Sequence, residues 1–262
     1  MFDIAIQIVN YKTKKYLLKC LEDVFNDLKD CDFSFVINIL DNNSGDDLSE
    51  LKKIFNNDDK INIFYSDKNL GFGGGHNLLS TKSDARYLLL LNPDVEIIEK
   101  NSIVRLFEKA EELNVSVVGP KLVNKNAEVQ VWDHGELFRL RAWIANNAGS
   151  AFWYDRDDIS EVAWVSGAVF LIKKNIFEKV GRFDENFFLY KEEEDLCVSI
   201  RKLGEKVIYD PTIRFMHINS VVAKKEVHMP ASAEYYNKKH YKNLFKRSIL
   251  NAINSLLWKI KN

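Results

Sequence analysis

Short apolar runs alternate with longer segments of helical periodicity over the first 120 residues. The runs predict strands at residues 3–9, 35–40, 61–65, 87–91 and 116–118. The segments between them predict helices at residues 14–28, 47–55, 75–81 and 101–113. Strands that alternate with helices in this way predict an α/β domain built on a doubly wound, mostly parallel sheet.

The fourth apolar run ends in a polar tripeptide. Four leucines occupy residues 88–91, and Asn92, Pro93 and Asp94 follow. Consecutive leucines predict a strand buried on both faces, and Pro93 ends it because proline cannot donate to a sheet ladder. Asp94 is then delivered to the carboxyl edge of the sheet, where ligands bind in open α/β folds. By itself the tripeptide is equally a polar turn, so the neighbouring motifs decide.

The remainder of the domain is patterned less regularly. Residues 119–162 carry three tryptophans in polar sequence, which predicts an insertion along one side of a cleft. Further strands are expected at residues 164–173, 206–209 and 213–216, and further helices at 175–180 and 192–203.

From Tyr235 onward, apolar residues fall on one side of a helix and basic residues on the other. The apolar side consists of Leu244, Phe245, Ile249, Ile253, Leu256, Leu257 and Ile260. Seven basic residues and no acidic residue follow Tyr235, although the whole chain has a net charge of −1. Such a helix can lie on an anionic membrane surface, or it can pack back on the domain or form a dimer contact. We therefore expect a domain at residues 1–225 and a basic amphipathic helical tail at 226–262, with no oligomeric state defined.

Composition narrows the class of protein. With 262 residues, 46% of them hydrophobic, the chain can bury a large core. Its three cysteines show neither metal-binding nor disulfide spacing, which favours a reducing, cytoplasmic setting. The sequence predicts neither a signal peptide nor a transmembrane helix. We also expect no nucleic-acid partner.

A glycine-rich motif follows the third predicted strand. Residues 69–77 contain four glycines in five positions, immediately before a predicted helix. Glycines let backbone approach a ligand and expose amides at a helix start, which suits a diphosphate. The motif is not a dinucleotide fingerprint, because His76 replaces the final glycine, and it lacks the Lys-Ser/Thr of a P-loop. The alternative is a flexible turn.

Polar residues also end the first two strands. Asn10 and Tyr11 follow the first strand, and Asp41 follows the second. A carboxylate can accept a hydrogen bond from a nucleobase imide, and a tyrosine can stack on the base. Taken alone, Asp41 is better explained as a helix cap or turn residue.

An acidic run at residues 192–195 follows an aromatic segment at 181–190. A carboxylate in a partly apolar cleft can act as general base, whereas an exposed acidic run would simply favour the helix dipole. Helical spacing places Glu192 and Asp195 on similar faces and points Glu193 elsewhere. His217 is a lone histidine, and it is either a structural residue or a second metal ligand beside Asp94.

Taken in this order, the motifs resemble those of an inverting glycosyltransferase of the GT-A fold, similar to family 2. The closest resemblance is to bacterial rhamnosyltransferase-like enzymes of O-antigen and capsule assembly. It rests on residues 8–11, 41–44, 69–77, 91–94, 166–168, 181–190, 192–197 and His217, and it covers about residues 3–220. The fold it implies is a Rossmann-like, mostly parallel central sheet with flanking helices, a nucleotide-binding half at about 1–120 and an acceptor and catalytic half at 121–225.

The resemblance also implies residue roles. Asp94 would bind Mg²⁺ or Mn²⁺ on the donor diphosphate, with His217 as a further ligand, and Asn92 in place of an acid leaves fewer charged ligands. The catalytic base falls on Glu193, where the family has aspartate, so Glu192 and Asp195 remain candidates. The implied donor-binding residues are Asn10, Tyr11, Asp41, Asn43, Asn69, Gly71, Gly73, Gly74, Asn77 and Asn92. The implied acceptor residues are Trp164, Gly167, Ala168 and Tyr190.

The function implied by the resemblance is metal-dependent transfer of a sugar, expected to be L-rhamnose, from a dTDP or UDP sugar. The acceptor would be a glycan or a polyprenyl-diphosphate-linked glycan at the inner face of the cell membrane. One rival is a catalytically silent nucleotide-sugar-binding protein, given Asn92 and Glu193. A second rival, a sugar nucleotidyltransferase, needs a Gly-rich loop after the first strand, where residues 10–13 contain no glycine.

Overall fold

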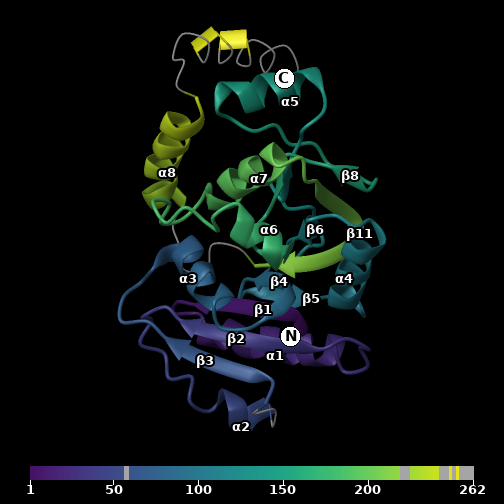
Figure 1. Cartoon of the computed structure of the whole chain (residues 1–262), viewed down its shortest axis with the longest axis vertical. Helices are drawn as coiled ribbons and strands as arrows, with labels where there is room; N and C mark the ends of the chain where they lie inside the picture. The colour runs from purple at the N-terminus through teal and green to yellow at the C-terminus, as the bar shows by residue number, and fades with distance from the viewer. Residues whose placement is uncertain (56–58, 219–224, 242–247, 250–251, 254–262) are drawn as a thin grey trace.

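The computed structural model describes residues 1–55, 59–218, 225–241, 248–249 and 252–253 (Figure 1). Within these ranges the central feature is a nine-stranded mixed sheet. Its order is β3 (Ile61–Tyr65), β2 (Phe35–Asp41), β1 (Phe2–Asn10), β4 (Ala85–Leu91), β10 (Val169–Lys173), β6 (Val117–Val123), β11 (Val207–His217) and β5 (Val95–Ile97), with β8 (Ser160–Glu161) beside β11. The first four strands pair in parallel, as do β6 and β11, while β10, β5 and β8 run the other way. The predicted mostly parallel sheet is therefore confirmed.

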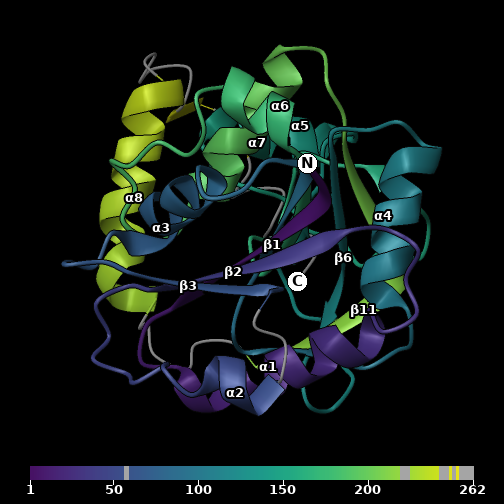
Figure 2. The ribbon, with the colours of Figure 1, turned by 60° about the horizontal axis from the view of Figure 1, so that its bottom comes forward.

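Helices cover both faces of the sheet, as Figure 2 shows. Helices α1 (Lys14–Asp27) and α4 (Ser102–Glu112) share one apolar core with the sheet, and α2 (Leu51–Phe55) lies on the same side. The opposite core is closed by α6 (Lys174–Lys179) and α7 (Glu192–Lys202), with α3 (Gly71–Ser80) packed on β1 beside them. The side chains of the leucine run in β4 alternate between these two cores, as expected for a strand buried on both faces.

Several element boundaries differ from those predicted. Helix α3 begins at Gly71, so the glycines lie within its first turns instead of before it. The single strand expected at 164–173 is broken at residues 166–168 into β9 (Trp164–Val165) and β10, and β9 pairs with β7 (His134–Gly135). Conversely, β11 is one strand with a register shift between Asp210 and Arg214, where two strands were expected. Strand β5 has only three residues, too few for a periodic signal.

A buried hydrogen-bonded network attaches the insertion to the sheet. Asp133 accepts from the Tyr209 hydroxyl at 2.8 Å, and it lies 2.7 Å from His134 Nδ1. Glu136 faces the other imidazole nitrogen at 3.3 Å and accepts from Arg156 at 2.7 Å. Burial alone would lower the pKa of His134, but hydrogen bonds to both carboxylates outweigh it and raise that pKa. The network fixes the wall of the cavity that this insertion forms.

Removing one donor from this network should reduce stability. We expect Tyr209→Phe to lower the free energy of unfolding by about 1–2 kcal/mol, because a buried carboxylate loses a hydrogen bond while keeping its other donors. Tyr154→Phe is the matched control, since Tyr154 is exposed. Chemical denaturation of both variants gives the comparison. Equal stability of the two would show that the Tyr209 hydroxyl contributes nothing.

Helix α8 (Lys225–His240) begins the predicted tail and packs on the domain. Lys239 Nζ and His240 Nε2 lie 2.9 and 2.6 Å from the carboxylate of Asp195, and Tyr236 is buried. The packing alternative therefore applies to this part of the tail. In the apolar stripe, Ile249 and Ile253 are helical and exposed, whereas its other members lie outside the described residues. No helix in the described part of the chain is long and apolar enough to cross a bilayer.

Candidate active site

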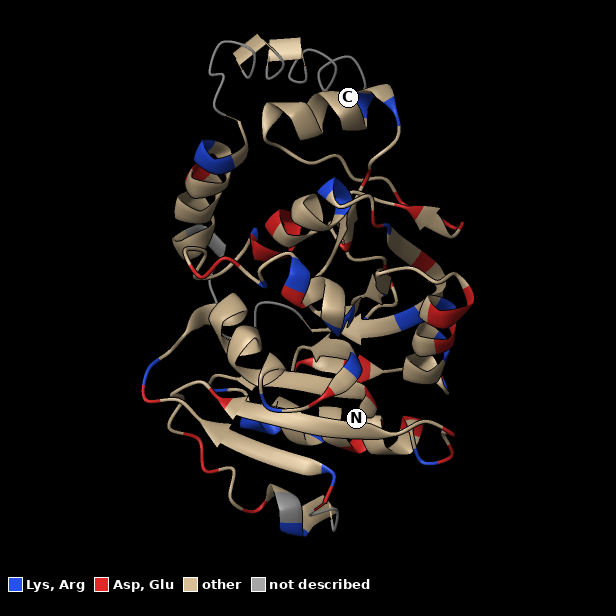
Figure 3. Ribbon diagram, in the orientation of Figure 1, with Lys and Arg blue, Asp and Glu red and all other residues tan. Residues whose placement is uncertain are grey.

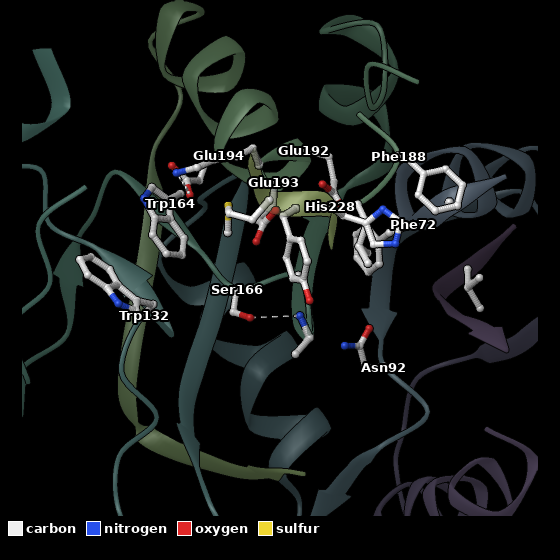
Figure 4. A pocket seen from close by; sticks show the side chains of 18 of the residues that line it. Phe72, Asn92, Trp132, Trp164, Ser166, Phe188, Glu192, Glu193, Glu194 and His228 are labelled. Carbon is white, nitrogen blue, oxygen red and sulfur yellow. Dashed lines mark hydrogen bonds and ion pairs between the residues drawn. The ribbon is translucent and has the colours of Figure 1, made fainter. Parts of the chain in front are cut away.

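A cavity of about 900 Å³ opens at the carboxyl ends of β1, β2 and β4. Many predicted site residues line it: Tyr11, Asn69, Gly71, Asn92, Asp94, Trp164, Gly167, Ala168, Tyr190, Glu192, Glu193 and His217. Figure 4 shows Trp132 and Trp164 on one side, Phe72, Phe188 and His228 on the other, and Glu193 between them. The sheet thus brings together side chains that are far apart in the sequence.

Asp94 and His217 meet at this edge of the sheet. Strand β11 pairs with β5 so that His217 lies opposite Val95, next to the end of β4. His217 Nε2 lies 3.4 Å from Asp94 Oδ1 and 3.4 Å from the Asn92 side-chain nitrogen. His217 Nδ1 lies 3.0 Å from Gln130 Oε1, so a proton on Nδ1 leaves the Nε2 lone pair facing Asp94.

These two side chains fit part of a divalent-cation site. A carboxylate oxygen and an imidazole nitrogen are both ligands that transition-metal ions accept, and Mg²⁺ often takes one or two carboxylates plus substrate phosphates. Within the described residues, no group of three or more His, Cys, Asp or Glu side chains could enclose a metal. A cation here would therefore need further ligands from a bound phosphate or from water.

The first turn of α7 lines the cavity with Glu192, Glu193 and Glu194. Glu192 is buried, its Oε2 lacks a hydrogen-bond partner among the described residues, and burial together with the charge of Glu193 raises its pKa well above the usual range. Glu193 is only partly buried, and Figure 4 shows its carboxyl group directed into the cavity. The pair therefore places a group that favours the neutral form beside one that water can reach.

Asp195 lies elsewhere, contrary to the expectation that it shares a face with Glu192 while Glu193 points away. Its carboxylate is buried against Lys239 and His240 of α8 and does not line the cavity. Glu194 lines the cavity but is paired with Lys191 at 2.7 Å. The expectation fails for Asp195 because the first three residues of α7 line the cavity, whereas Asp195 lies on the side of the helix that faces α8.

The end of β2 contributes a residue that sequence reasoning missed. Asn42 is buried, lines the cavity and donates to Asn69 at 3.0 Å and to the Gly71 carbonyl at 3.1 Å. Its neighbour Asn43, which was predicted instead, is exposed with φ +61° and does not line the cavity. The motif marked the right segment, but the sequence did not show which side chain faces inward.

Asn10 and Asp41 lie behind this wall and do not line the cavity themselves. The Asn10 side chain donates to Asp41 at 3.0 Å and accepts from Thr13 at 2.8 Å. Asp41 also accepts from the backbone amide and the hydroxyl of Ser44. Asn10 and Asp41, which were predicted to bind the sugar donor, therefore hold the ends of β1 and β2 together.

The glycines of α3 serve close packing. A Cβ on Gly71, which has φ +73°, would lie 2.2 Å from the Phe188 carbonyl oxygen, and one on Gly73 would lie 2.9 Å from the Phe183 side chain. The Gly71 amide donates to Asn69 and the Phe72 amide to Phe188, so protein groups occupy both.

Residues further along α3 face the same aromatic segment. Asn77 holds the backbone of Phe183 through hydrogen bonds at 2.9 and 3.0 Å. A Cβ on Gly74 would lie 3.1 Å from Leu70. Gly73, Gly74 and Asn77 do not line the cavity, so Gly71 is the one glycine of the predicted diphosphate-binding motif that does, together with Asn69 and Phe72.

The close approach at Gly71 should be measurable. Gly71→Ala and Gly181→Ala both force a side chain into positive φ, at a cost of about 1–2 kcal/mol each. Only Gly71→Ala also meets a neighbour, since nothing lies within 4 Å of a Cβ at Gly181. We expect it to lose a further 1–3 kcal/mol or so in unfolding free energy, as overpacked sites do. Equal losses in thermal or chemical denaturation would contradict the clash.

Several further cavity residues are not among the site residues predicted from the sequence. Gln130, Trp132 and Ser166 come from the irregular insertion and its boundary, where no periodicity marks an inward face. His228 comes from α8, which the sequence assigned to the tail, and its ring lies 5.2 Å from that of Phe188. The tryptophans of the insertion were the only signal for this side.

Two transferases are similar to this chain in sequence. A low-salt glycan biosynthesis hexosyltransferase of Haloferax volcanii is 28% identical over 207 residues, covering 76% of this chain and 62% of that protein. An N-acetylglucosaminyl-diphospho-decaprenol L-rhamnosyltransferase of Mycobacterium tuberculosis is 35% identical over 77 residues, or 29% of this chain and 25% of that protein. The chain thus spans less than two thirds of the length of these relatives.

Solved structures share the fold. GalNAc-T7 with UDP, GalNAc and Mn²⁺ matches with a TM-score of 0.59 and 14% identity, over 83% of this chain and 44% of that one. TarS of S. aureus matches with a TM-score of 0.60 and 14% identity, over 83% and 37%. These likenesses confirm the predicted GT-A architecture.

The family described as "Glycosyl transferase family 2" matches residues 5–181. That range is more than half of the chain and includes the sheet edge that carries Asp94. The match, the fold and the order of the motifs agree. The chain belongs to glycosyltransferase family 2.

Proposed function

We propose that this chain transfers a sugar, with inversion, from a nucleoside-diphosphate sugar to a hydroxyl group of a glycan or lipid-linked glycan. The observation that carries the proposal is that one cavity holds both the Asp94–His217 pair and the Glu192–Glu193 pair. The first pair suits a diphosphate leaving group, and the second suits an acceptor hydroxyl. The hexosyltransferase and rhamnosyltransferase relatives support the same class of reaction.

The donor would occupy the side of the cavity formed by Tyr11, Asn42 and Asn69. Tyr11 can stack on the base, and the amide side chains can bind the ribose or diphosphate. Asp94 and His217 would hold Mg²⁺ or Mn²⁺. Such an ion, when bound, stabilises the charge of the departing diphosphate as a Lewis acid. We expect a dTDP or UDP sugar, with dTDP-rhamnose first among the donors to test.

Glu193 would act as general base. Its carboxylate accepts the proton of the acceptor hydroxyl as that oxygen forms a bond to the anomeric carbon, and the bond to the diphosphate oxygen breaks on the opposite face. Burial and the charge of Glu193 raise the pKa of Glu192 next to it, which favours the neutral form and so disfavours a second negative charge on the acceptor side. Trp132 and Trp164 provide aromatic faces on which an acceptor sugar can stack.

The names of two relatives support a proposal for the acceptor and the place of the reaction. One relative is named for a diphospho-decaprenol acceptor, and another is an O-antigen biosynthesis protein of Myxococcus xanthus. We therefore propose a polyprenyl-diphosphate-linked glycan as acceptor, in surface polysaccharide synthesis at the cytoplasmic face of the membrane.

Nucleotide titration and donor hydrolysis together test this function. We expect UDP or dTDP to bind more tightly with Mn²⁺ than without, and one member of a nucleotide-sugar panel to be slowly hydrolysed. Binding without any turnover, with donor and candidate acceptors present, would favour the silent binding protein. Release of pyrophosphate from a nucleoside triphosphate and a sugar phosphate would favour the nucleotidyltransferase.

A further inference from the structure

Helix α5 (Leu140–Ala148) has two contrasting faces. Its small and aliphatic residues Ala142, Ile144, Ala145 and Ala148 are buried. The other face and its flanks expose large apolar side chains, namely Phe138 (58% exposed), Leu140 (72%), Trp143 (52%) and Tyr154 (41%). Exposed apolar residues gathered in this way mark interaction surfaces more often than scattered ones do.

The same surface carries two arginines, and the aspartates that follow it are ion-paired, Asp155 and Asp157 with Lys121 and Asp158 with Arg156. Arg139 and Arg141 flank Leu140, and residues 137–154 contain no acidic residue. The Arg139 guanidinium lies 4.2 Å from the centre of the Tyr154 ring. Figure 3 shows the blue residues of α5 separated from the acidic residues of β8 and α7. Tryptophan, phenylalanine and leucine beside arginine are the residues that anchor proteins in the interface of an anionic bilayer.

The surface adjoins the acceptor side of the cavity. Helix α5 ends at Ala148, and the next three residues, Gly149, Ser150 and Ala151, line the cavity. The hydroxyl of Tyr241, at the end of α8, donates to the Asn146 carbonyl and ties α5 to that helix. A surface bound at α5 would therefore lie next to the side of the cavity that carries Trp132 and Trp164.

We propose that Phe138, Arg139, Leu140, Arg141, Trp143 and Tyr154 form a docking surface, the α5 patch, for an anionic membrane leaflet. The inference rests on the proposed function, because a lipid-linked acceptor must reach the cavity while its hydrocarbon chain stays in the bilayer. If α5 lies in the headgroup region, the part of the cavity wall formed by residues 149–151 lies at the membrane. The glycan of a diphosphate-linked acceptor then has only a short distance to cover from the leaflet to the cavity. The patch thereby selects acceptors held in an anionic membrane.

A second copy of the chain suits this patch less well. In a symmetric dimer formed through α5, the same surface meets itself, so Arg139 and Arg141 of both copies would approach one another. Like charges brought together at an interface are unfavourable. Anionic headgroups instead attract each such arginine at a membrane surface.

Vesicle binding by the full-length chain tests the α5 patch. We expect sedimentation with phosphatidylcholine vesicles that contain phosphatidylglycerol, and weak sedimentation with phosphatidylcholine alone. Leu140→Ser/Trp143→Ser should lower the partition coefficient about tenfold or more, since each side chain loses apolar burial. Arg139→Gln/Arg141→Gln should lower it about fivefold for each arginine and remove the dependence on phosphatidylglycerol. Leu113→Ser, exposed after α4, is the control and should bind as the parent chain does.

The outcomes separate this inference from the proposed function. Unchanged vesicle binding in both double variants, or loss of binding only in Ile249→Ser/Ile253→Ser, would overturn the α5 patch, the latter by assigning the contact to the tail. The α5 patch would also be overturned if the parent chain bound no vesicles but formed concentration-dependent dimers that the α5 variants did not form. Nucleotide affinity with Mn²⁺ should be unchanged in every variant. Absence of nucleotide binding in the parent chain would instead contradict the proposed function, whatever the vesicles show.

Discussion

Glu193→Gln is expected to lower kcat for sugar transfer by about 10²–10⁴-fold, the usual contribution of a general base. The substitution keeps the size of a side chain that lines the cavity and removes only its capacity to accept a proton. Nucleotide affinity should change little, because the residues proposed to bind the donor, Tyr11, Asn42 and Asn69, are unchanged. Steady-state kinetics with the donor identified by panel screening, together with nucleotide titration, measures both quantities.

Glu192→Gln is the informative control. Because the pKa of Glu192 is raised, its carboxyl group favours the neutral form, which glutamine resembles in shape and charge. We therefore expect this variant to keep most of its activity, as should Glu194→Gln, whose carboxylate is paired with Lys191. Near-full activity in Glu193→Gln with loss in Glu192→Gln would move the base to Glu192.

The same buried carboxyl group should affect stability as pH changes. A group with a raised folded-state pKa contributes stability that is fully present below its unfolded-state pKa of about 4.5 and is lost as pH rises through the folded value. Glu192→Gln removes this titration. The variant should therefore show a smaller decrease in unfolding free energy between mildly acidic and mildly alkaline pH than the parent chain. An identical pH dependence would contradict the buried neutral form.

Asp94→Ala is expected to reduce the metal-dependent part of nucleotide affinity by at least tenfold. Asp94 Oδ1 lies 3.4 Å from His217 Nε2, and among the described residues no other carboxylate pairs with this histidine. The affinity for nucleotide without metal should stay the same, because the base is proposed to stack on Tyr11 and not to contact Asp94. Calorimetric titration of UDP or dTDP with and without Mn²⁺ separates these two quantities.

Matched variants sharpen this result. Asp84→Ala removes an exposed aspartate at the opposite end of β4 and should leave nucleotide affinity unchanged. Gln130→Ala should weaken the metal effect less than Asp94→Ala, since Gln130 only orients the imidazole of His217. Equal affinities for Asp94→Ala and the parent chain, with Mn²⁺ present, would remove Asp94 from the site.

The parts of this site that sit at strand ends could be predicted from the sequence. A leucine run with a terminal Pro-Asp fixes both the depth of β4 and the edge at which Asp94 emerges, because parallel strands end together. The same reasoning placed Tyr11, and the resemblance to family 2 placed His217. Placement of the residues between strands was less accurate, since a motif gives no direction for each side chain, as Asn42 and Asn43 illustrate.

Long-range polar contacts explain the remaining differences. Asp195 belongs to an acidic run that suggests catalysis, yet its partners Lys239 and His240 lie more than forty residues later, as the ion pairs of the folded chain show. The network of Asp133, His134 and Glu136 likewise depends on Tyr209, a strand residue with no sequence signal linking it to the insertion. Such contacts arise from packing between elements, which local periodicity does not encode.

Helix α8 also has a consequence for how relatives of this chain can diverge. The family match ends at residue 181, whereas Glu193, His217 and the cavity residues of α8, Val227, His228, Met229 and Ala233, follow it. The stretch that matches the family and the cavity wall contributed by α8 are thus separate parts of the sequence. A chimeric chain joined near Gly181 would therefore take Asp94 and Trp164 from one parent and His217, Glu193 and the α8 wall from the other, so it would assemble its cavity, including the Asp94–His217 pair, from two parents.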